Sequence, residues 1–159
     1  MNNHRYGLVD SKVAAQLSGR QLLQAIIDGQ QPHPPISKAL SFWIVEVGEG
    51  TAAFEGAPGP DVLNPMGSVH GGWALTLIDS VAACAAHTLL PAGSAYVTVE
   101  TKANFSRPIT QDGGPVRAQG RVLTQGRQII LAEATLLAKD GRILAHGTST
   151  ILVQVARSA

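Results

Sequence analysis

The sequence predicts an α+β fold in which a six-stranded antiparallel sheet wraps around one long central helix. The run from residue 73 to residue 90 has helical length and contains a single charged residue, Asp79. A helix that is apolar on nearly every side must be covered on nearly every side. Two strand-like segments precede this run and four follow it. One sheet curved around the helix satisfies these observations together.

Composition narrows the class of protein. A chain of 159 residues is long enough for one domain with a substantial core, and its 14% of charged residues is low for a fully solvated surface, which favours contact with another copy. The net charge of +1 comes from scattered Lys and Arg, so we expect no nucleic acid partner. The single cysteine, Cys84, fits a reducing compartment. No signal-peptide core or membrane-spanning run occurs, so we expect a cytoplasmic protein without a membrane partner.

Residues 1–35 are predicted to form an N-terminal helical extension, followed by the main domain at 36–159. The pattern from residue 11 to residue 28 is helical, since Ser18 starts a capping-box pattern and an apolar stripe follows it. Gly29 fits the position after the helix end, and nearby prolines then break any helix. We expect this segment to pack over a sheet edge or a neighbour; the alternative is a lid over a pocket.

The strand predictions depend on β-rich segments bounded by Gly and Pro. Gln125-Gly126 and Asp140-Gly141 are hairpin signals, and such short connections make the last three strands antiparallel neighbours. No internal repeat interrupts the pattern. The predicted strands cover roughly residues 40–47, 51–56, 95–106, 115–124, 128–139 and 143–155.

The segment before the central helix, residues 64–72 (NPMGSVHGG), reads as a loop that directs backbone N–H groups into a helix N-terminus. Such a terminus stabilises developing negative charge. Within the helix, Asp79 has only Leu, Thr and Ala at the positions three and four residues away, so no cation on the same helix can pair with it. A carboxylate in so apolar a helix is costly to bury, which indicates a specific role.

The spacing of Gly71 and Asp79 carries a second implication. Eight residues on one helix place them roughly 12 Å apart along the axis, too far to act on one small reacting group. If both residues are functional, they must therefore come from two copies of the chain. A two-fold dimer with antiparallel central helices would bring Gly71 of one copy opposite Asp79 of the other, twice.

These residues resemble a known family. The pattern N-P-x-G-x-x-H-G-G, with Asp nine residues after the His, is similar to that of hotdog-fold acyl-CoA thioesterases, and most similar to the phenylacetate-pathway (PaaI-like) branch. The segments VTVE at 97–100, NFSRP at 104–108 and AHGT at 145–148 add to the resemblance, which extends over residues 38–153. It implies the hotdog fold and hydrolysis of an acyl-CoA to the free acid and CoA.

The resemblance also implies roles for individual residues. The backbone N–H of Gly71 would polarise the thioester carbonyl, and Asp79 of the partner chain would act as general base or as nucleophile. Asn64 and His70 would lie near the thioester, with Asn64 placing either His70 or the attacking water. Thr98 matches a position where the family often has a Ser or Thr that helps to hold that water.

Substrate-binding roles are implied for Gly72, for Trp73 as a wall of the acyl pocket, and for Arg107 at the nucleotide end of CoA. Branches with Glu in place of Asp79 have Thr four residues later, whereas this chain has Ala83, which favours the Asp branch. No metal and no cofactor are expected, because CoA is part of the substrate. The expected assembly is a homodimer or a tetramer built from two dimers.

Alternatives remain for function and for each residue. A hotdog protein that binds acyl-CoA without cleaving it is the main rival, and a dehydratase ranks last. A serine esterase is not expected, because no G-x-S-x-G motif is present. The His spacings match no zinc pattern. Asp79, His70 and Asn64 can each have a purely structural role, and the two glycines at 71 and 72 can serve only close approach of loop and sheet.

Overall fold

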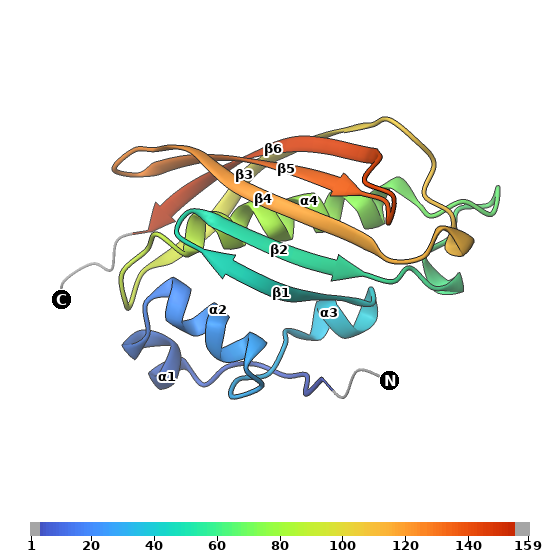
Figure 1. Ribbon diagram of the computed structural model, residues 1–159. Coiled ribbons are helices and arrows are strands. Elements are labelled where there is room, and N and C mark those ends of the chain that lie inside the picture. The colour runs from blue at the N-terminus through green and yellow to red at the C-terminus, as the bar shows by residue number, and fades with distance from the viewer. Residues whose placement is uncertain (1–3, 155–159) are drawn as a thin grey trace.

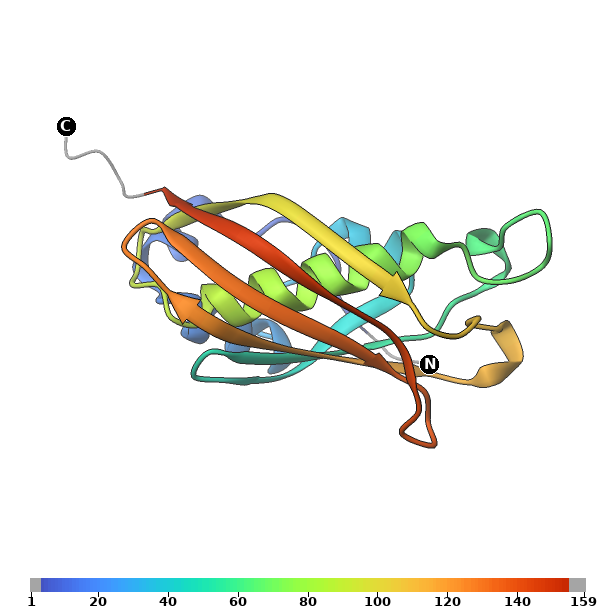
Figure 2. The ribbon, with the colours of Figure 1, turned by 90° about the horizontal axis from the view of Figure 1, so that it is seen from above.

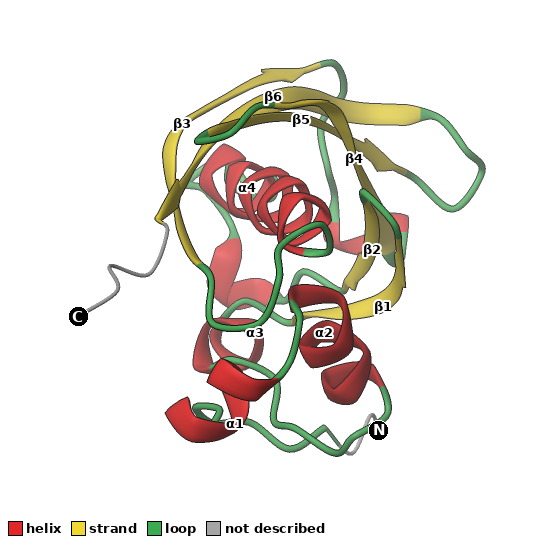
Figure 3. Cartoon of the chain, turned by 90° about the vertical axis from the view of Figure 1, so that its left-hand side faces the viewer, coloured by secondary structure: helices red, strands yellow, loops and turns green. Residues whose placement is uncertain are grey.

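The computed structural model describes residues 4–154. Its strands are β1 (Phe42–Gly48), β2 (Thr51–Gly56), β3 (Ala95–Phe105), β4 (Val116–Gln125), β5 (Ile129–Leu137) and β6 (Ile143–Gln154). They form one antiparallel sheet in the order β1-β2-β4-β5-β6-β3, which curves over the long helix α4 (Gly71–His87) (Figure 3). The α+β class, the six strands and the wrapped helix are therefore confirmed.

The N-terminal segment forms three short helices on the side of α4 that the sheet leaves open (Figures 1 and 3). They are α1 (Ser11–Gln16), α2 (Gly19–Ile27) and α3 (Pro35–Ala39). The segment predicted to be helical, residues 11–28, is divided into two helices at Leu17, which is extended. Ser18 next to it caps α2 with the expected capping box, and a cap residue has extended backbone, so α1 cannot continue through it.

The proline-rich connector separates α2 from α3 as predicted, but its last proline, Pro35, belongs to α3. Pro35 occupies the first turn of α3, where a missing N–H costs nothing because the first helical amides have no internal acceptor. Gly29 ends α2 with a φ of 73°, as its position predicted. Two 3₁₀ turns, η1 (Pro60–Val62) and η2 (Gln111–Gly113), complete the helical elements among the described residues.

Helix α4 is the centre of the core. Leu77, Ile78 and Val81 have no exposed surface, and the alanines that follow on the helix are buried as well. Several buried strand residues are also small, among them Ala118 and Ala132. Gly120 of β4 lies against the helix backbone: a Cβ there would be 2.5 Å from the Val81 carbonyl oxygen. Small residues on both surfaces therefore let helix and sheet approach closely.

The two edges of the sheet differ. Strand β1 is covered by α2, whereas β3 is the last strand on the opposite side and no described segment pairs with its outer edge (Figure 2). Strand boundaries differ from the predictions by a few residues; β1 begins at Phe42 because Ser41 has a φ of 52°. The predicted end of the last strand, Val155, lies outside the described residues. No helix in the described part is long and apolar enough to cross a bilayer.

Candidate active site

The loop before α4 is held by the side chain of Asn64. Its Oδ1 accepts hydrogen bonds from the backbone N–H groups of Met66, at 2.9 Å, and Ser68, at 3.1 Å. Gly67 completes the turn with a φ of 80°, and the Val69 N–H donates to the Ile109 carbonyl. Asn64 therefore builds the loop. The Oδ1 atom that makes these bonds is already occupied, so any contact of Asn64 with substrate or water would use its amide NH₂.

His70 is the N-cap of α4. Its Nδ1 accepts a hydrogen bond from the Gly72 N–H at 2.8 Å. A neutral imidazole that accepts through Nδ1 has its proton on Nε2, so exposed His70 presents a hydrogen-bond donor rather than a base. The same contact occupies the Gly72 N–H, which leaves Gly72 no free amide for a substrate.

Gly71 is different from its neighbours. The next two amides of the helix are used, since Gly72 donates to the His70 side chain and Trp73 donates to the His70 carbonyl. Within residues 4–154 the Gly71 N–H donates no hydrogen bond. It is therefore an available donor at the positive end of a 17-residue helix, which is the property an oxyanion site requires.

Asp79 lies on the same helix and is held by a hydroxyl of β3. The Thr101 hydroxyl is 3.0 Å from Asp79 Oδ1 and 2.8 Å from the Ser149 Oγ of β6. A threonine has one hydroxyl proton, and Thr101 donates it to the carboxylate. In the second hydrogen bond Ser149 is therefore the donor and the Thr101 oxygen is the acceptor. In the described residues, Asp79 has no cation within ion-pair distance, and its Oδ2 accepts no hydrogen bond. One carboxylate oxygen is fixed and the other is free.

Thr101 and Ser149 were not predicted from the sequence. In a regular strand Thr98 and Thr101, three residues apart, would point to opposite faces. The pairing of β3 with β6 shifts register between Thr98 and Glu100, so one extra residue turns Thr101 to the face of Thr98. The polar spacing along the strand was visible in the sequence, but the bulge was not.

Asp79 and Thr98 line one open hollow of about 380 Å³ beside α4. Strand β3 and the helix α3 supply its other walls, and much of the lining is apolar: Leu75, Val99 and Ile36 each present exposed side chains there. The predicted water-holding residue and the predicted base therefore share a surface. That surface is open to solvent in the single chain.

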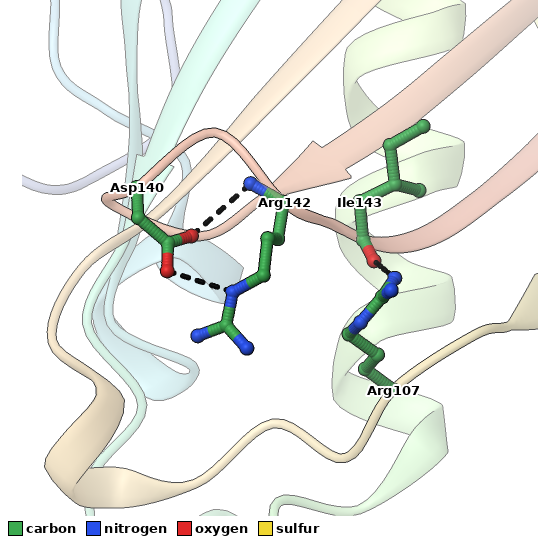
Figure 4. A network of polar contacts seen from close by, with 4 residues as sticks. All are labelled: Arg107, Asp140, Arg142 and Ile143. Atoms are coloured by element: carbon green, nitrogen blue, oxygen red, sulfur yellow. Dashed lines mark hydrogen bonds and ion pairs between the residues drawn. The ribbon is translucent and has the colours of Figure 1, made fainter.

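Trp73 and Arg107 lie away from this hollow. Trp73 is buried in the core, where its Nε1 donates to the Leu40 carbonyl at 2.7 Å. Arg107 follows β3 and donates to the Ile143 carbonyl at 2.9 Å; Figure 4 shows it near the ion pair of Asp140 and Arg142. Hydrogen bonds from the Arg142 backbone N–H and, second, from its guanidinium lower the pKa of Asp140. In one chain the predicted residues thus form separate groups, at the start and in the middle of α4.

Cys84 lies one turn beyond Asp79 and is not suited to act as a nucleophile. Burial, with the nearby Asp79 charge as a smaller cause, raises the pKa of its thiol to about 12. The thiolate is the reactive form, so this cysteine stays inert near neutral pH. Among the described residues no group of His, Cys, Asp and Glu is arranged to hold a metal ion.

The sequence matches a family model over residues 66–145, which span the helix start, Asp79 and the strands β3, β4 and β5; the family is described as the thioesterase superfamily. A relative from Saccharolobus solfataricus, named as a candidate esterase, is 31% identical over 108 residues, which is 68% of this chain and 75% of the relative. The chain belongs to the thioesterase superfamily.

Solved structures agree with this assignment. A thioesterase family protein from Silicibacter pomeroyi matches with a TM-score of 0.75 and 26% identity, over 87% of this chain and 99% of that one. A phenylacetic acid degradation-related protein from Ralstonia eutropha JMP134 gives 0.74 and 26%, over 82% and 98%. The E. coli PaaI protein from the phenylacetic acid degradation operon gives 0.69 and 25%, over 76% and 84%.

The fold is therefore the hotdog fold, and the protein is a PaaI-like thioesterase, as the sequence resemblance predicted. Its general chemistry is thioester hydrolysis. The thioester that it cleaves and the residues that act on it are considered next.

Proposed function

We propose that the protein hydrolyses acyl-CoA thioesters at sites that two copies of the chain form together. Gly71 of one copy donates its N–H to the thioester oxygen, and Asp79 of the other copy supplies the carboxylate. The observation that carries this proposal is the free Gly71 amide on the same helix as an unpaired carboxylate oxygen, roughly 12 Å away along the axis. One chain alone cannot apply both groups to one carbonyl.

The outer edge of β3 supports an assembly of that kind. This strand has 11 residues, and no described segment pairs with its outer edge. Its exposed side chains include Val97, Val99 and Phe105, and the neighbouring Leu75 of α4 is also exposed. A long unpaired strand edge beside exposed apolar side chains is unfavourable in a monomer, so we infer that two copies join their β3 edges and bring the two α4 helices side by side.

The proposed reaction needs no metal. The Asp79 carboxylate takes a proton from water as the water oxygen bonds to the carbonyl carbon, and the Gly71 N–H stabilises the negative charge on the carbonyl oxygen. The C–S bond then breaks, and the CoA sulfur leaves as a thiolate that takes up a proton. In the alternative route the carboxylate attacks the carbonyl carbon directly, and water cleaves the resulting anhydride. Thr101 fixes the carboxylate in either route.

Arg107 is our candidate for the phosphates of CoA. A Cβ at Gly71 would be 3.3 Å from the Phe105 ring, so the end of β3 lies beside the start of α4. Arg107 follows two residues later, is exposed, and uses one of its nitrogens on the Ile143 carbonyl. The remaining N–H groups of its guanidinium fit a phosphate.

A matched pair of variants at Gly71 tests the proposal. Gly71→Pro removes the amide proton, and proline suits the first position of a helix; the extended backbone of His70 also accepts a following proline. Gly71→Ala retains the N–H and adds a similar Cβ. The assay uses a thiol-reactive dye to measure the CoA released from each member of a panel of acyl-CoAs. We expect the kcat of the Pro variant to fall roughly 10²–10³-fold and that of the Ala variant to fall far less.

Asp79→Asn completes the test and separates an enzyme from a binding protein. We expect its turnover to fall by orders of magnitude while the dimer persists in size-exclusion chromatography. If wild type hydrolyses no acyl-CoA of the panel, the hydrolase proposal is wrong. If all three variants hydrolyse as wild type does, the assigned roles are wrong.

A further inference from the structure

A second pocket lies between the N-terminal segment and the core, and most of its lining residues precede the region that the family model matches. It has a volume of about 220 Å³. Apolar side chains form most of its wall, among them Leu23 and Ile26 of α2, Ile44 of β1 and Phe54 of β2. Because α2 contributes to it, this pocket is a product of the N-terminal helices.

Two buried polar side chains line this pocket without a partner. Ser37 is 0% exposed and His33 is 3% exposed. Among residues 4–154, neither the Oγ of Ser37 nor the Nδ1 of His33 has a hydrogen-bond partner. An unsatisfied buried polar group costs about 1–3 kcal/mol, so native proteins rarely keep two of them in one place without a use.

Ordered water alone is a poor occupant. At about 30 Å³ each, roughly seven waters would fill the volume, and each needs about 2–4 polar partners. A wall of Leu, Ile and Phe side chains supplies few. By contrast, a dry cavity of about 150 Å³ is large enough to hold benzene. An apolar body with one polar end suits this lining better than water does.

The ionisable side chains of the pocket are neutral near neutral pH. Burial lowers the pKa of His33, and it raises the pKa of Tyr96 and that of Cys84, the latter to about 12. An imidazole, a thiol and a phenol in their uncharged forms offer no counter-charge. The polar end of the occupant is therefore uncharged, as a hydroxyl is, and a carboxylate would be excluded.

The pocket adjoins the hollow that contains Asp79. Helix α4 contributes Asp79 to the hollow and Cys84 to the pocket, and β3 contributes Thr98 to the hollow and Tyr96 to the pocket. Helix α3 lies between them, since Ile36 lines the hollow and Ser37 the pocket. Five residues of α4 separate Asp79 from Cys84, which is roughly 7.5 Å along the axis. A medium-length acyl group spans that distance.

We propose that this pocket binds the far end of the acyl group and that Ser37 and His33 select an acyl chain with a terminal hydroxyl. The inference rests on the proposed hydrolase function. With the thioester carbonyl at Asp79, the chain passes α3 and its hydroxyl reaches the part of the pocket lined by Ser37 and His33. There the hydroxyl forms one hydrogen bond, with the Ser37 Oγ.

The test compares kcat/KM for acetyl-CoA and for matched acyl-CoAs with and without a terminal hydroxyl: butanoyl, hexanoyl and octanoyl. For wild type we expect 6-hydroxyhexanoyl-CoA to be preferred over hexanoyl-CoA by about 5- to 10-fold, the value of one hydrogen bond. Adipoyl-CoA, with a terminal carboxylate, should be a poorer substrate than hexanoyl-CoA. Acetyl-CoA ends before the pocket and serves as the internal control.

Two variants separate polar recognition from pocket volume. Ser37→Ala should abolish the preference for the hydroxyl, and Cys84→Leu, which fills the pocket, should lower kcat/KM for hexanoyl-CoA at least 10-fold relative to acetyl-CoA. Absence of hydrolysis by wild type would overturn the proposed function and this inference with it. If wild type hydrolyses acyl-CoAs without preferring the hydroxyl, or if both variants keep the selectivity of wild type, this inference alone would be overturned.

Discussion

Replacing Thr101 by Val removes the hydroxyl that joins Asp79 to Ser149. The Thr101 hydroxyl lies 3.0 Å from the carboxylate and 2.8 Å from Ser149, which is 1% exposed. Stability should fall by about 1–3 kcal/mol, because the buried Ser149 hydroxyl loses its acceptor. A hydrogen bond to a charged group contributes about 1.5–3 kcal/mol, and since Asp79 is half-exposed we take the lower value, which is roughly a 10-fold loss of kcat/KM.

Two further variants distinguish positioning from a general loss of stability. Thr101→Ser retains the hydroxyl and should keep activity near that of wild type. The double variant Thr101→Val with Ser149→Ala removes both polar groups, so urea unfolding should show most of the stability regained, while the acyl-CoA assay should still show the loss in activity. If Val and Ser at position 101 are equally active, or if the double variant regains activity with stability, Thr101 does not position Asp79.

Three other predictions concern packing and titration. Gly120→Ala should lower unfolding free energy by about 3 kcal/mol, because its Cβ would meet the Val81 backbone, whereas Gly59→Ala, in open space, should be near neutral in the same denaturation experiment. Burial lowers the pKa of His33, so as the pH falls the unfolded chain binds a proton at this histidine before the folded chain does. Stability should therefore decline as the pH falls below about 6.5, and His33→Asn should make that decline shallower. Cys84, with a pKa of about 12, should react with iodoacetamide at about pH 8 on the order of a thousandfold more slowly in the native protein than in urea.

Local sequence patterns predicted the main architecture. The apolar run around Asp79 required cover on nearly every side, and the sheet provides it. The Ser18 capping box and the terminal position of Gly29 are local patterns of a few residues, and both are confirmed. The glycine-containing loop was correctly predicted to lead into α4, although the helix begins at Gly71, two residues before the apolar run.

The rest depends on contacts that no short pattern contains. Thr101 reaches Asp79 only because one bulge in β3 shifts the register against β6. Residues 33 and 37 line a pocket with Cys84, about 50 positions later in the chain, through the packing of α2 and α3 against the core. Leu17 interrupts a pattern that is helical on both sides, and only the cap at the next residue explains the break.

The central claim is that each active site contains Gly71 from one copy and Asp79 from the other. It is tested most directly by mixed dimers. One chain carries Gly71→Pro and the other carries Asp79→Ala, with different affinity tags so that the mixed dimer can be purified away from both parent dimers. In the mixed dimer one site would have both intact groups, and the other site would have neither.

The measurement is acyl-CoA hydrolysis per dimer, compared with wild type and with each parent variant. A shared site predicts that both parent dimers are nearly inactive and that the mixed dimer recovers about one half of wild-type activity, because one of its two sites is complete. A mixed dimer as inactive as its parents would contradict the account, since it would mean that both groups act from the same chain.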